Sequence, residues 1–494
     1  MNAVTARVAQ GIISGSTTAG IRRFLGIPYA AAPVGDVRFR EPRPAPAWNG
    51  TRDATRPGAN APQRTGAFPG LDTAALIGSG WAKGDDYLTL NIWTPDGDAA
   101  GRPVMVFIHG GGFVVGSKDA PAQDGTAFAR DGVVCVAINY RMGVDGFLPI
   151  PGVPTNLGLR DMIAALGWVR ENIAAFGGDA DNVTVFGESA GAMAISDLIT
   201  SPLARGLFAR AIIQSGHGGM TRSIPVMQRL VRKLGKALKV APTAAGFASA
   251  PQEAILNAVE TLSKPTARVD LRDENGHEPV FGISRFVPVH GDDVLPKRPL
   301  DALMDGAGAE IDVLIGTNAE EMNLYLVPTG VRDRIGRLLA TYVLHKSQPQ
   351  ARKVLKAYGI GTKGRKPGQA LTNAMTDLVF RWPARRFAEE HRGRTHMYQF
   401  DWRSPQFGGE LGAAHAMEIP FVFDTLAATT GEQGISGTSP PQDLATRMHA
   451  IWVQYAKDGT LPWPEFDRNT RLVYSITRDE ATFEPAMPAA PFLP

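Results

Sequence analysis

The sequence predicts an α/β protein whose central β-sheet is mostly parallel and is flanked by helices. Short apolar runs rich in valine and isoleucine recur along the chain, and each run ends in glycine or polar residues. Runs of this kind are typical of strands that are buried on both faces of a sheet. Helical patterns lie between several of these runs, and this alternation favours a parallel sheet with helices on both sides.

Six apolar runs are the predicted strands of the sheet, and two clear helices are predicted between them. One helix is predicted at residues 159–176, where apolar residues recur near i, i+3 or i+4 and i+7. The other is predicted at residues 190–200, directly after a glycine-rich turn. The predicted strands are residues 104–109, 133–139, 183–187, 210–216, 312–316 and 397–402.

Two regions do not follow this alternation. Residues 1–60 combine short β-like pieces with proline and glycine, which predicts a small antiparallel sheet near the entrance of the site. Residues 222–385 are richer in helical patterns, which predicts a helical subdomain that forms the pocket. Residues 1–494 are still predicted to form a single domain, because α/β architectures often reach this length as one unit.

The composition indicates a large apolar core and no nucleic-acid partner. Of the 494 residues, 44% are hydrophobic and 20% are charged, and the formal net charge is +3 with both signs mixed along the chain. Without a basic block, nucleic acid is not an expected partner. The single cysteine, Cys135, excludes an intrachain disulfide.

Targeting and membrane segments are not expected either. The first fifteen residues lack a continuous apolar stretch, and no apolar run approaches the length of a membrane span. The expected location is therefore the cytoplasm, and the sequence leaves the oligomeric state open.

The pentapeptide Gly187-Glu-Ser-Ala-Gly191 matches the pattern G-x-S-x-G, which occurs once in the chain. A predicted strand leads into it and a predicted helix follows it, which is the context of a nucleophile elbow. The flanking glycines let neighbouring backbone approach closely, and the helix start places N–H groups and a positive dipole end near the hydroxyl. Ser189 is therefore the predicted nucleophile, rather than a serine in an ordinary turn.

A serine nucleophile needs a base, and the oxyanion that forms on an attacked carbonyl needs hydrogen-bond donors. The run His109-Gly-Gly-Gly-Phe113 ends a predicted strand, and its glycines allow N–H groups to point at an oxyanion. Gly111, Gly112 and Ala190 are the predicted donors, and His109 is interpreted as a structural residue of the loop. No G-K-[ST] or G-x-G-x-x-G context follows, so a nucleotide site is not expected.

Ordered blocks over nearly the whole chain resemble the type-B carboxylesterase family of the α/β-hydrolase fold. This family includes bacterial para-nitrobenzyl esterases, cholinesterases and bile-salt-activated lipases. The resemblance implies a serine carboxylesterase that hydrolyses small-molecule esters through an acyl-enzyme, with no cofactor and no metal. The matching blocks are FLGIPYAAAPVGDVRF (24–39), YLTLNIWTP (87–95), FIHGGGF (107–113), NYRMGVDGF (139–147), residues 156–192, IIQSG (212–216), IGTNAEE (315–321) and AAHAMEIPFVF (413–423).

The resemblance also implies a Ser–Glu–His triad with Ser189 as nucleophile and His415 as base. His415 lies on a loop after the last predicted strand, as the chain order of this fold requires. Three other late histidines are interpreted as structural or solvated. They are His391, His396 and His449.

Two adjacent carboxylates, Glu320 and Glu321, follow the predicted strand at 312–316. Both qualify as the triad acid from their position alone. The family pattern G-x-N-x-[DE]-E-G implies that the acid is Glu321 and that Glu320 is a solvated or structural neighbour. Met322 stands where the family has glycine, so either the turn differs or the Met322 side chain reaches into the pocket.

The resemblance assigns further structural positions. Arg141 with Asp179, and Arg38 with Asp85, resemble two buried ion pairs of the family. In several relatives a disulfide closes an early loop, but here Ala61 and Tyr87 stand at those positions. Ile77 stands where cholinesterases carry the tryptophan that binds quaternary ammonium, so choline specificity is not expected.

The candidate substrate-binding residues are Phe113, Glu188, His217 and Met322, and Glu188 either tunes the site or is a hydrogen-bonded wall residue. The apolar character of residues 222–385 favours small to medium or aromatic esters, including xenobiotic ones. One alternative is an amidase or carbamate hydrolase with the same triad. The other is a non-catalytic, cholinesterase-like binding protein. The sequence disfavours this alternative, because all three triad positions hold a residue of the required type.

Overall fold

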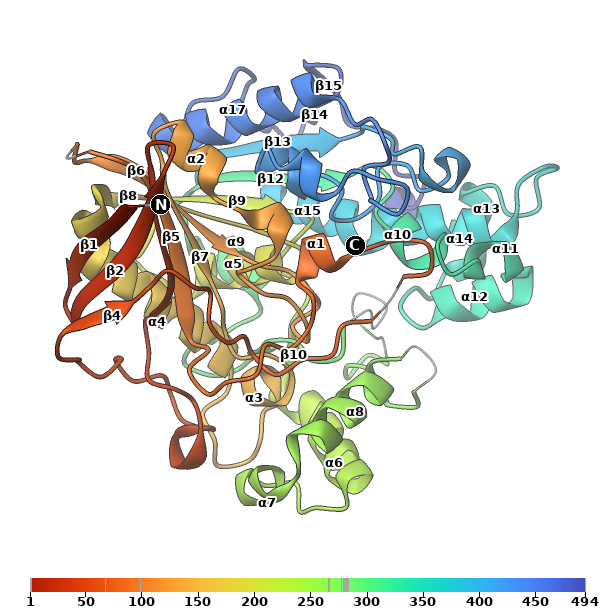
Figure 1. Cartoon of the computed structure of the whole chain (residues 1–494). Coiled ribbons are helices and arrows are strands. Elements are labelled where there is room, and N and C mark those ends of the chain that lie inside the picture. The colour runs from red at the N-terminus through yellow and green to blue at the C-terminus, as the bar shows by residue number, and fades with distance from the viewer. Residues whose placement is uncertain are drawn as a thin grey trace.

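The computed structural model describes residues 2–66, 68–97, 99–264, 267–276, 278 and 284–493. Within these residues lies a thirteen-stranded sheet in the order β1-β2-β3-β5-β7-β6-β8-β9-β12-β13-β14-β15, with β4 paired to β2 (Figure 1). The strands from β7 to β14 in this order run parallel to one another. The predicted α/β fold with a mostly parallel sheet is therefore confirmed.

The six predicted strands correspond to β6, β7, β8, β9, β12 and β13, and a separate parallel pair is formed by β10 and β11. The strands are β1 Asn2–Val8, β2 Gly11–Thr18, β3 Ile21–Pro28, β4 Thr51–Asp53, β5 Thr89–Pro95, β6 Arg102–Ile108, β7 Val134–Ile138, β8 Gly178–Glu188, β9 Arg210–Gln214, β10 Arg222–Ser223, β11 Val289–His290, β12 Asp312–Asn318, β13 Thr395–Phe400, β14 Leu472–Ser475 and β15 Glu480–Phe483.

Both faces of the sheet are buried, which explains why its central strands are almost continuously apolar. Val104, Val106 and Ile108 of β6 point into one hydrophobic core, and Met105 and Phe107 point into a second core on the opposite face. Helices α4 and α5 contribute to the first core, and α16 and α17 contribute to the second. Because successive side chains of a strand point to opposite faces of the sheet, one apolar run supplies side chains to both cores.

The two helices predicted between strands are present as α4, with the short turn Ile173–Phe176 after it, and α5. Among the described residues, no helix combines the length and apolar character needed to cross a membrane. The helices are α1 Ala74–Ile77, α2 Thr126–Arg130, α3 Gly143–Phe147, α4 Leu157–Asn172, α5 Ala190–Thr200, α6 Ile224–Leu238, α7 Ala244–Ser249, α8 Gln252–Ser263, α9 Pro299–Met304, α10 Asn323–Leu326, α11 Val331–Arg334, α12 Arg337–His345, α13 Ala351–Ala357, α14 Pro367–Thr376, α15 Trp382–Glu390, α16 Ile419–Val422 and α17 Gln442–Asp458.

The N-terminal strands differ in one respect from the prediction. Strands β1, β2 and β3 are antiparallel, as expected for residues 1–60, but β3 also pairs with β5. The small sheet is thus continuous with the central sheet rather than separate from it. Pairing with β5 provides hydrogen-bond partners for backbone N–H and C=O groups of β3, which would otherwise be an unpaired edge strand.

The range 222–385 holds two groups of helices that project from the sheet, α6–α8 and α11–α14 (Figure 1). The same range also contains β12, which is a strand of the central sheet. A helical subdomain with these limits stays a prediction, as does the single domain over 1–494. Residues 265–266, 277 and 279–283 of this range lie outside the described residues.

The two ion pairs expected from the resemblance are wrong in their acidic partners. The Nη2 of Arg141 lies 2.6 Å from Asp161 Oδ1, with both side chains fully buried, and Arg38 pairs with Asp145 at 2.9 Å. Asp85 is exposed. The arginine in each pair was identified correctly, but its partner comes from a helix, α4 or α3, that only the fold brings close.

Strand direction explains why Asp179 cannot reach Arg141. Arg141 follows the carboxyl end of β7, whereas Asp179 lies at the amino end of β8, and both strands are parallel to β6. Parallel strands place these ends at opposite edges of the sheet, roughly 15 Å apart at about 3.3 Å per residue. Asp179 instead accepts the backbone N–H of Asp181.

We expect Asp161→Asn to lower the free energy of unfolding by about 3–5 kcal/mol, because it leaves the buried charge of Arg141 without its counter-ion. Asp179→Asn is the matched control and is expected to change stability by less than about 1 kcal/mol. Urea unfolding of both variants, followed by tryptophan fluorescence, checks this. Equal destabilisation by the two substitutions would contradict the assignment of the pair.

Candidate active site

Ser189 lies in a sharp turn between β8 and α5, with a φ of 55° and a ψ of −121°. Such a backbone conformation is costly for a residue with a side chain, and it persists only where the surroundings impose it. A Cβ on Gly191 would lie 2.0 Å from the carbonyl oxygen of Ile108, and one on Gly187 would lie 2.6 Å from the same atom. The two glycines therefore let β6 pack directly against the turn, and the strand–turn–helix context predicted for the elbow is present.

Three residues predicted from the sequence meet in one hydrogen-bonded chain. Ser189 Oγ lies 2.8 Å from His415 Nε2, and His415 Nδ1 lies 2.6 Å from Glu321 Oε2. The other carboxylate oxygen of Glu321 accepts the backbone N–H of Asn318 at 2.8 Å. Because Nδ1 donates to Glu321, Nε2 is the nitrogen that can accept the proton of the serine hydroxyl.

The two adjacent glutamates have different surroundings. Glu321 is fully buried beside His415, whereas Glu320 accepts the backbone N–H of Ala413 and forms an ion pair with the exposed Arg403. Position alone left both residues open as the acid, and the geometry favours Glu321. Met322 has a φ of −72°, so this turn does not require glycine.

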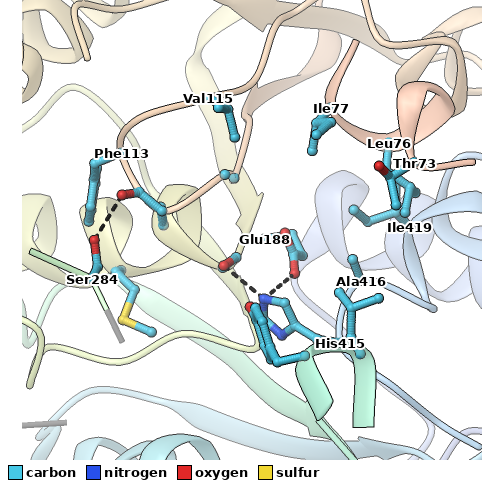
Figure 2. A pocket seen from close by; sticks show the side chains of 18 of the residues that line it. Thr73, Leu76, Ile77, Phe113, Val115, Glu188, Ser284, His415, Ala416 and Ile419 are labelled. Atoms are coloured by element: carbon cyan, nitrogen blue, oxygen red, sulfur yellow. Dashed lines mark hydrogen bonds and ion pairs between the residues drawn. The ribbon is translucent and has the colours of Figure 1, made fainter. Parts of the chain in front are cut away.

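The glycine-rich loop and the start of α5 line the pocket next to Ser189. Gly111 and Gly112 have positive φ values of 104° and 62°, and both lie in the pocket wall with Ala190. The carbonyl of Gly112 accepts a hydrogen bond from Ser284 Oγ at 2.8 Å, which holds the loop (Figure 2). Ala190 is the first residue of α5, where a backbone N–H has no acceptor within the helix. These N–H groups can stabilise negative charge on a substrate oxygen.

His109 belongs to the scaffold of this loop. Its Nδ1 donates to the carbonyl of Gly110 at 2.9 Å, and its ring stacks on Tyr140 with 4.5 Å between centroids. Burial lowers the pKa of His109 to about 4, so the ring is neutral at pH 7. These contacts agree with its interpretation as a structural residue.

The four candidate substrate-binding residues separate into two pairs. Phe113 and Glu188 line the pocket, whereas His217 and Met322 are buried and are not among the lining residues. The Nε2 of His217 donates to the carbonyl of Val379 at 2.7 Å. The sequence could not separate the pairs, because it does not show which way these side chains point.

Glu188 faces the same ring nitrogen as the serine hydroxyl. Its Oε1 lies 3.0 Å from His415 Nε2 (Figure 2). Burial raises the pKa of Glu188 to about 8, although the charge of His415 opposes this shift. Burial by itself lowers the pKa of His415, but the negative charges of Glu188 and Glu321 outweigh it and raise that pKa to about 9.

A further buried carboxylate, Glu418, was missed by the sequence analysis. Its oxygens accept hydrogen bonds from the side-chain amides of Asn318 at 2.6 Å and Gln214 at 3.2 Å. Burial raises the pKa of Glu418, and the nearby charge of Glu321 adds to that shift. The signal that could have identified it is an acid within the apolar run AMEIPFVF, three residues after His415.

The pocket above this chain of residues has a volume of about 240 Å³ and a largely apolar lining. Figure 2 shows Phe113 and Ser284 on one side, Leu76, Ile77 and Ile419 on the other, and His415 with Glu188 between them. The group of polar side chains is thus at the floor of an apolar cavity. No cluster of histidine, cysteine, aspartate or glutamate in the described part of the chain has the geometry of a metal site.

A parallel sheet with a strained serine between β8 and α5, hydrogen-bonded to a histidine and an acid from later strand ends, defines a hydrolase of the α/β-hydrolase fold. The comparison with protein families agrees, because the model described as "Carboxylesterase family" matches residues 2–489. The chain belongs to this family and is a carboxylic ester hydrolase.

Individual relatives are similar over almost their whole length. The para-nitrobenzyl esterase of Bacillus subtilis is 34% identical over 96% of this chain and 94% of the relative. The phenmedipham hydrolase of Pseudarthrobacter oxydans is 34% identical over 93% and 92%. Among solved structures, a carboxylesterase of Geobacillus stearothermophilus has a TM-score of 0.82 and 33% identity, with 96% of each chain covered.

We expect Glu321→Gln to lower kcat/KM about 10³–10⁴-fold, because an amide in place of the carboxylate can favour the wrong tautomer of His415. Glu320→Gln, which changes the adjacent side chain in the same way, is expected to retain activity within a few-fold. Steady-state kinetics with a soluble p-nitrophenyl ester measure both. A larger loss in Glu320→Gln would mean that the acid is not Glu321.

The contact between Glu188 and His415 predicts a change in pH dependence. His415 can accept a proton only when Nε2 is unprotonated, so activity rises with pH through the pKa of His415. Glu188→Gln removes a negative charge that raises this pKa. The acidic limb of the profile of kcat/KM against pH should therefore move to lower pH.

Glu320→Gln is the control for this profile, and its acidic limb should stay in place. An acidic limb of Glu188→Gln that is unchanged, or that moves to higher pH, would contradict the proposed coupling.

Proposed function

We propose that the chain hydrolyses carboxylic esters by covalent catalysis, with Ser189 as nucleophile, His415 as general base and acid, and Glu321 as the acid that orients His415. The observation that carries this proposal is the continuous hydrogen-bonded chain from Ser189 to Glu321 at the floor of the apolar pocket. A serine hydroxyl becomes an effective nucleophile when such a base is within hydrogen-bonding distance.

In the first half of the proposed reaction, His415 Nε2 takes the proton of Ser189 as Oγ bonds to the ester carbonyl carbon. The carbonyl electrons move to its oxygen, and the N–H groups of Gly111, Gly112 and Ala190 stabilise that oxyanion. When the carbonyl reforms, the bond to the alcohol oxygen breaks, and this oxygen takes the proton from His415. The product is an ester of Ser189 with the acyl group.

In the second half, His415 takes a proton from water as the water oxygen attacks the acyl carbon. The tetrahedral species then releases Ser189, which regains its proton from His415, and the carboxylic acid leaves. The carboxylate of Glu321 stabilises the imidazolium that forms in each half. The residues at the floor of the pocket account for every proton transfer, and the proposal needs no cofactor.

The pocket supports small to medium or aromatic esters as the substrate class. A dry cavity of about 150 Å³ is known to hold a benzene ring, and this pocket measures about 240 Å³. Its wall includes Ile77, the residue that stands in place of the cholinesterase tryptophan. We therefore propose uncharged esters, including xenobiotic aromatic ones, rather than choline esters.

Carbamate hydrolysis by the same residues is the second candidate function, and the similarity to a phenmedipham hydrolase supports it. A carbamate carbonyl would be attacked by the same serine and held by the same donors. A cytoplasmic location and an amidase activity stay predictions from the sequence.

Ser189→Ala should lower kcat by at least about 10⁴-fold while the protein remains folded, because the covalent step is lost. An organophosphate should label the unmodified protein at one site per chain, identified as Ser189 by peptide mass spectrometry, and should not label the variant. Retained esterase activity in a correctly folded Ser189→Ala variant would exclude the proposed nucleophile.

A series of p-nitrophenyl esters should show an optimum at short or medium acyl chains, since the pocket volume limits the acyl group that fits. Matched ester, carbamate and anilide substrates with the same acyl group would rank the two candidate functions directly. An optimum at very long acyl chains would contradict the proposed substrate class.

A further inference from the structure

Positive charge is concentrated in one of the helical groups that project from the sheet. Residues 331–366 contain ten lysines and arginines and a single acidic residue, Asp333. This segment therefore has an excess of nine positive charges, and because the whole chain has a net charge of +3, the remainder has an excess of six negative charges. The mixed-sign charge pattern expected from the sequence does not hold here.

Most of these charges point to solvent. Nine of the ten basic side chains are exposed, and the buried one, Arg332, is paired with Glu410. Asp333 is paired with Lys366 at 3.0 Å. The segment contains α11, α12 and α13, which lie at the edge of the molecule away from the N-terminal strands (Figure 1).

Exposed apolar side chains occur in the same segment. Leu338 is 89% exposed, Tyr342 is 64% exposed and Leu339 is 49% exposed, and Val331 of α11 is 40% exposed. Five other large apolar side chains are exposed in the described part of the chain, and they are spread over five separate elements or loops. Four such residues within twelve positions form an exposed apolar patch, whose contact with water is unfavourable.

The geometry of α12 places apolar and basic groups on one outer face. Ala340 and Leu344 are buried against the rest of the group, which directs Leu338 and Tyr342, one turn apart, to solvent. Lys346 follows one turn later, and its Nζ lies 5.6 Å from the centroid of the Tyr342 ring. Arg334 and Arg337 precede Leu338 and are exposed. We call the set Arg334, Arg337, Leu338, Leu339, Tyr342 and Lys346 the α12 face.

We propose that the α12 face binds the surface of an anionic lipid bilayer. Leucine and tyrosine side chains flanked by lysine and arginine are the composition of helices that lie in the membrane interface. The basic side chains of the neighbouring helices add attraction to anionic headgroups, which acts within about one Debye length. The proposal does not depend on the proposed esterase mechanism, because binding to a bilayer requires none of the residues at the floor of the pocket.

Two observations favour a bilayer over other partners. A nucleic acid would pair with the basic groups but would leave the Leu338 side chain facing phosphates. A bilayer would instead remove the Leu338 side chain from water. A second copy of the chain would bring two like-charged faces together. Helix α6 also has exposed basic residues, but none of its large apolar side chains is among the exposed ones. It therefore lacks the exposed apolar groups that a membrane-binding face needs.

The α12 face also lies close to the proposed site along the chain. Leu324 and Tyr325 of α10 line the pocket, and α11 begins at Val331. Only a short stretch of chain therefore joins this wall of the pocket to the α12 face.

Vesicle flotation with the full-length protein tests the proposal. The protein should float with vesicles of phosphatidylcholine mixed with phosphatidylserine and much less with pure phosphatidylcholine, and added salt should weaken the binding. Arg334→Gln, Arg337→Gln and Lys346→Gln combined should lower the partition coefficient roughly 100-fold, on the basis of the attraction of each basic residue to an anionic surface. Leu338→Ser with Tyr342→Ser should lower it at least about tenfold.

Matched controls separate this face from general effects of charge and exposure. Arg232→Gln, Lys233→Gln and Lys236→Gln on α6 remove the same charge, and Phe483→Ser removes an aromatic side chain that is 79% exposed elsewhere. Both controls should retain vesicle binding. All variants should hydrolyse a soluble p-nitrophenyl ester as the unmodified protein does, which shows that they are folded.

Four results would overturn the proposal. The first is equal flotation with neutral and anionic vesicles, and the second is an α6 control that loses as much binding as the α12 variants. The third is binding of duplex DNA that is as tight as vesicle binding and unaffected by the Leu338 and Tyr342 substitutions. The fourth is a concentration-dependent dimer in sedimentation that these two substitutions abolish.

Discussion

A hydrogen-bonded chain from Ser189 through His415 to Glu321 is the interaction on which the arrangement of the site depends. Its members are far apart in sequence, because the residue numbers of Ser189 and His415 differ by 226 and those of Glu321 and His415 differ by 94. They meet because β8, β9, β12 and β13 are parallel neighbours, so that the loops after these strands leave the sheet at one edge. The strained turn at Ser189 and the glycine contacts with β6 then hold the hydroxyl at that edge.

The imidazole at the centre of this chain is surrounded by buried carboxylates. Glu321 contacts one ring nitrogen and Glu188 the other, and Glu418 is close enough to Glu321 for the charge of Glu321 to raise the pKa of Glu418. Burying a carboxylate is costly unless hydrogen bonds or a shifted pKa compensate. Asn318 provides such a hydrogen bond to two of these carboxylates, because its backbone N–H donates to Glu321 and its side-chain amide donates to Glu418. The raised pKa values of Glu188, Glu418 and His415 follow from the same crowding.

The ion pairs illustrate where inference from the sequence fails. The resemblance identified Arg141 and Arg38 correctly as paired residues, but a spacing along the chain does not determine which acid lies opposite. Asp161 and Asp145 reach these arginines from the helices that follow β7, whereas Asp179 lies at the other edge of the sheet. The same limit applies to His217 and Met322, which are buried and do not line the pocket that the sequence associated with them.

The sequence by itself determined the α/β class, the six central strands, the elbow at Ser189 and the glycine-rich loop, because these features follow from local patterns of apolar residues and glycine. Position alone left two adjacent glutamates open as the acid, and the resemblance implied Glu321. The tertiary structure favours the same residue, since burial beside His415 distinguishes Glu321 from Glu320 at the surface. The partners of the buried arginines, the place of Glu418 and the outward face of α12 were likewise decided by the packing of distant segments, which no local pattern encodes.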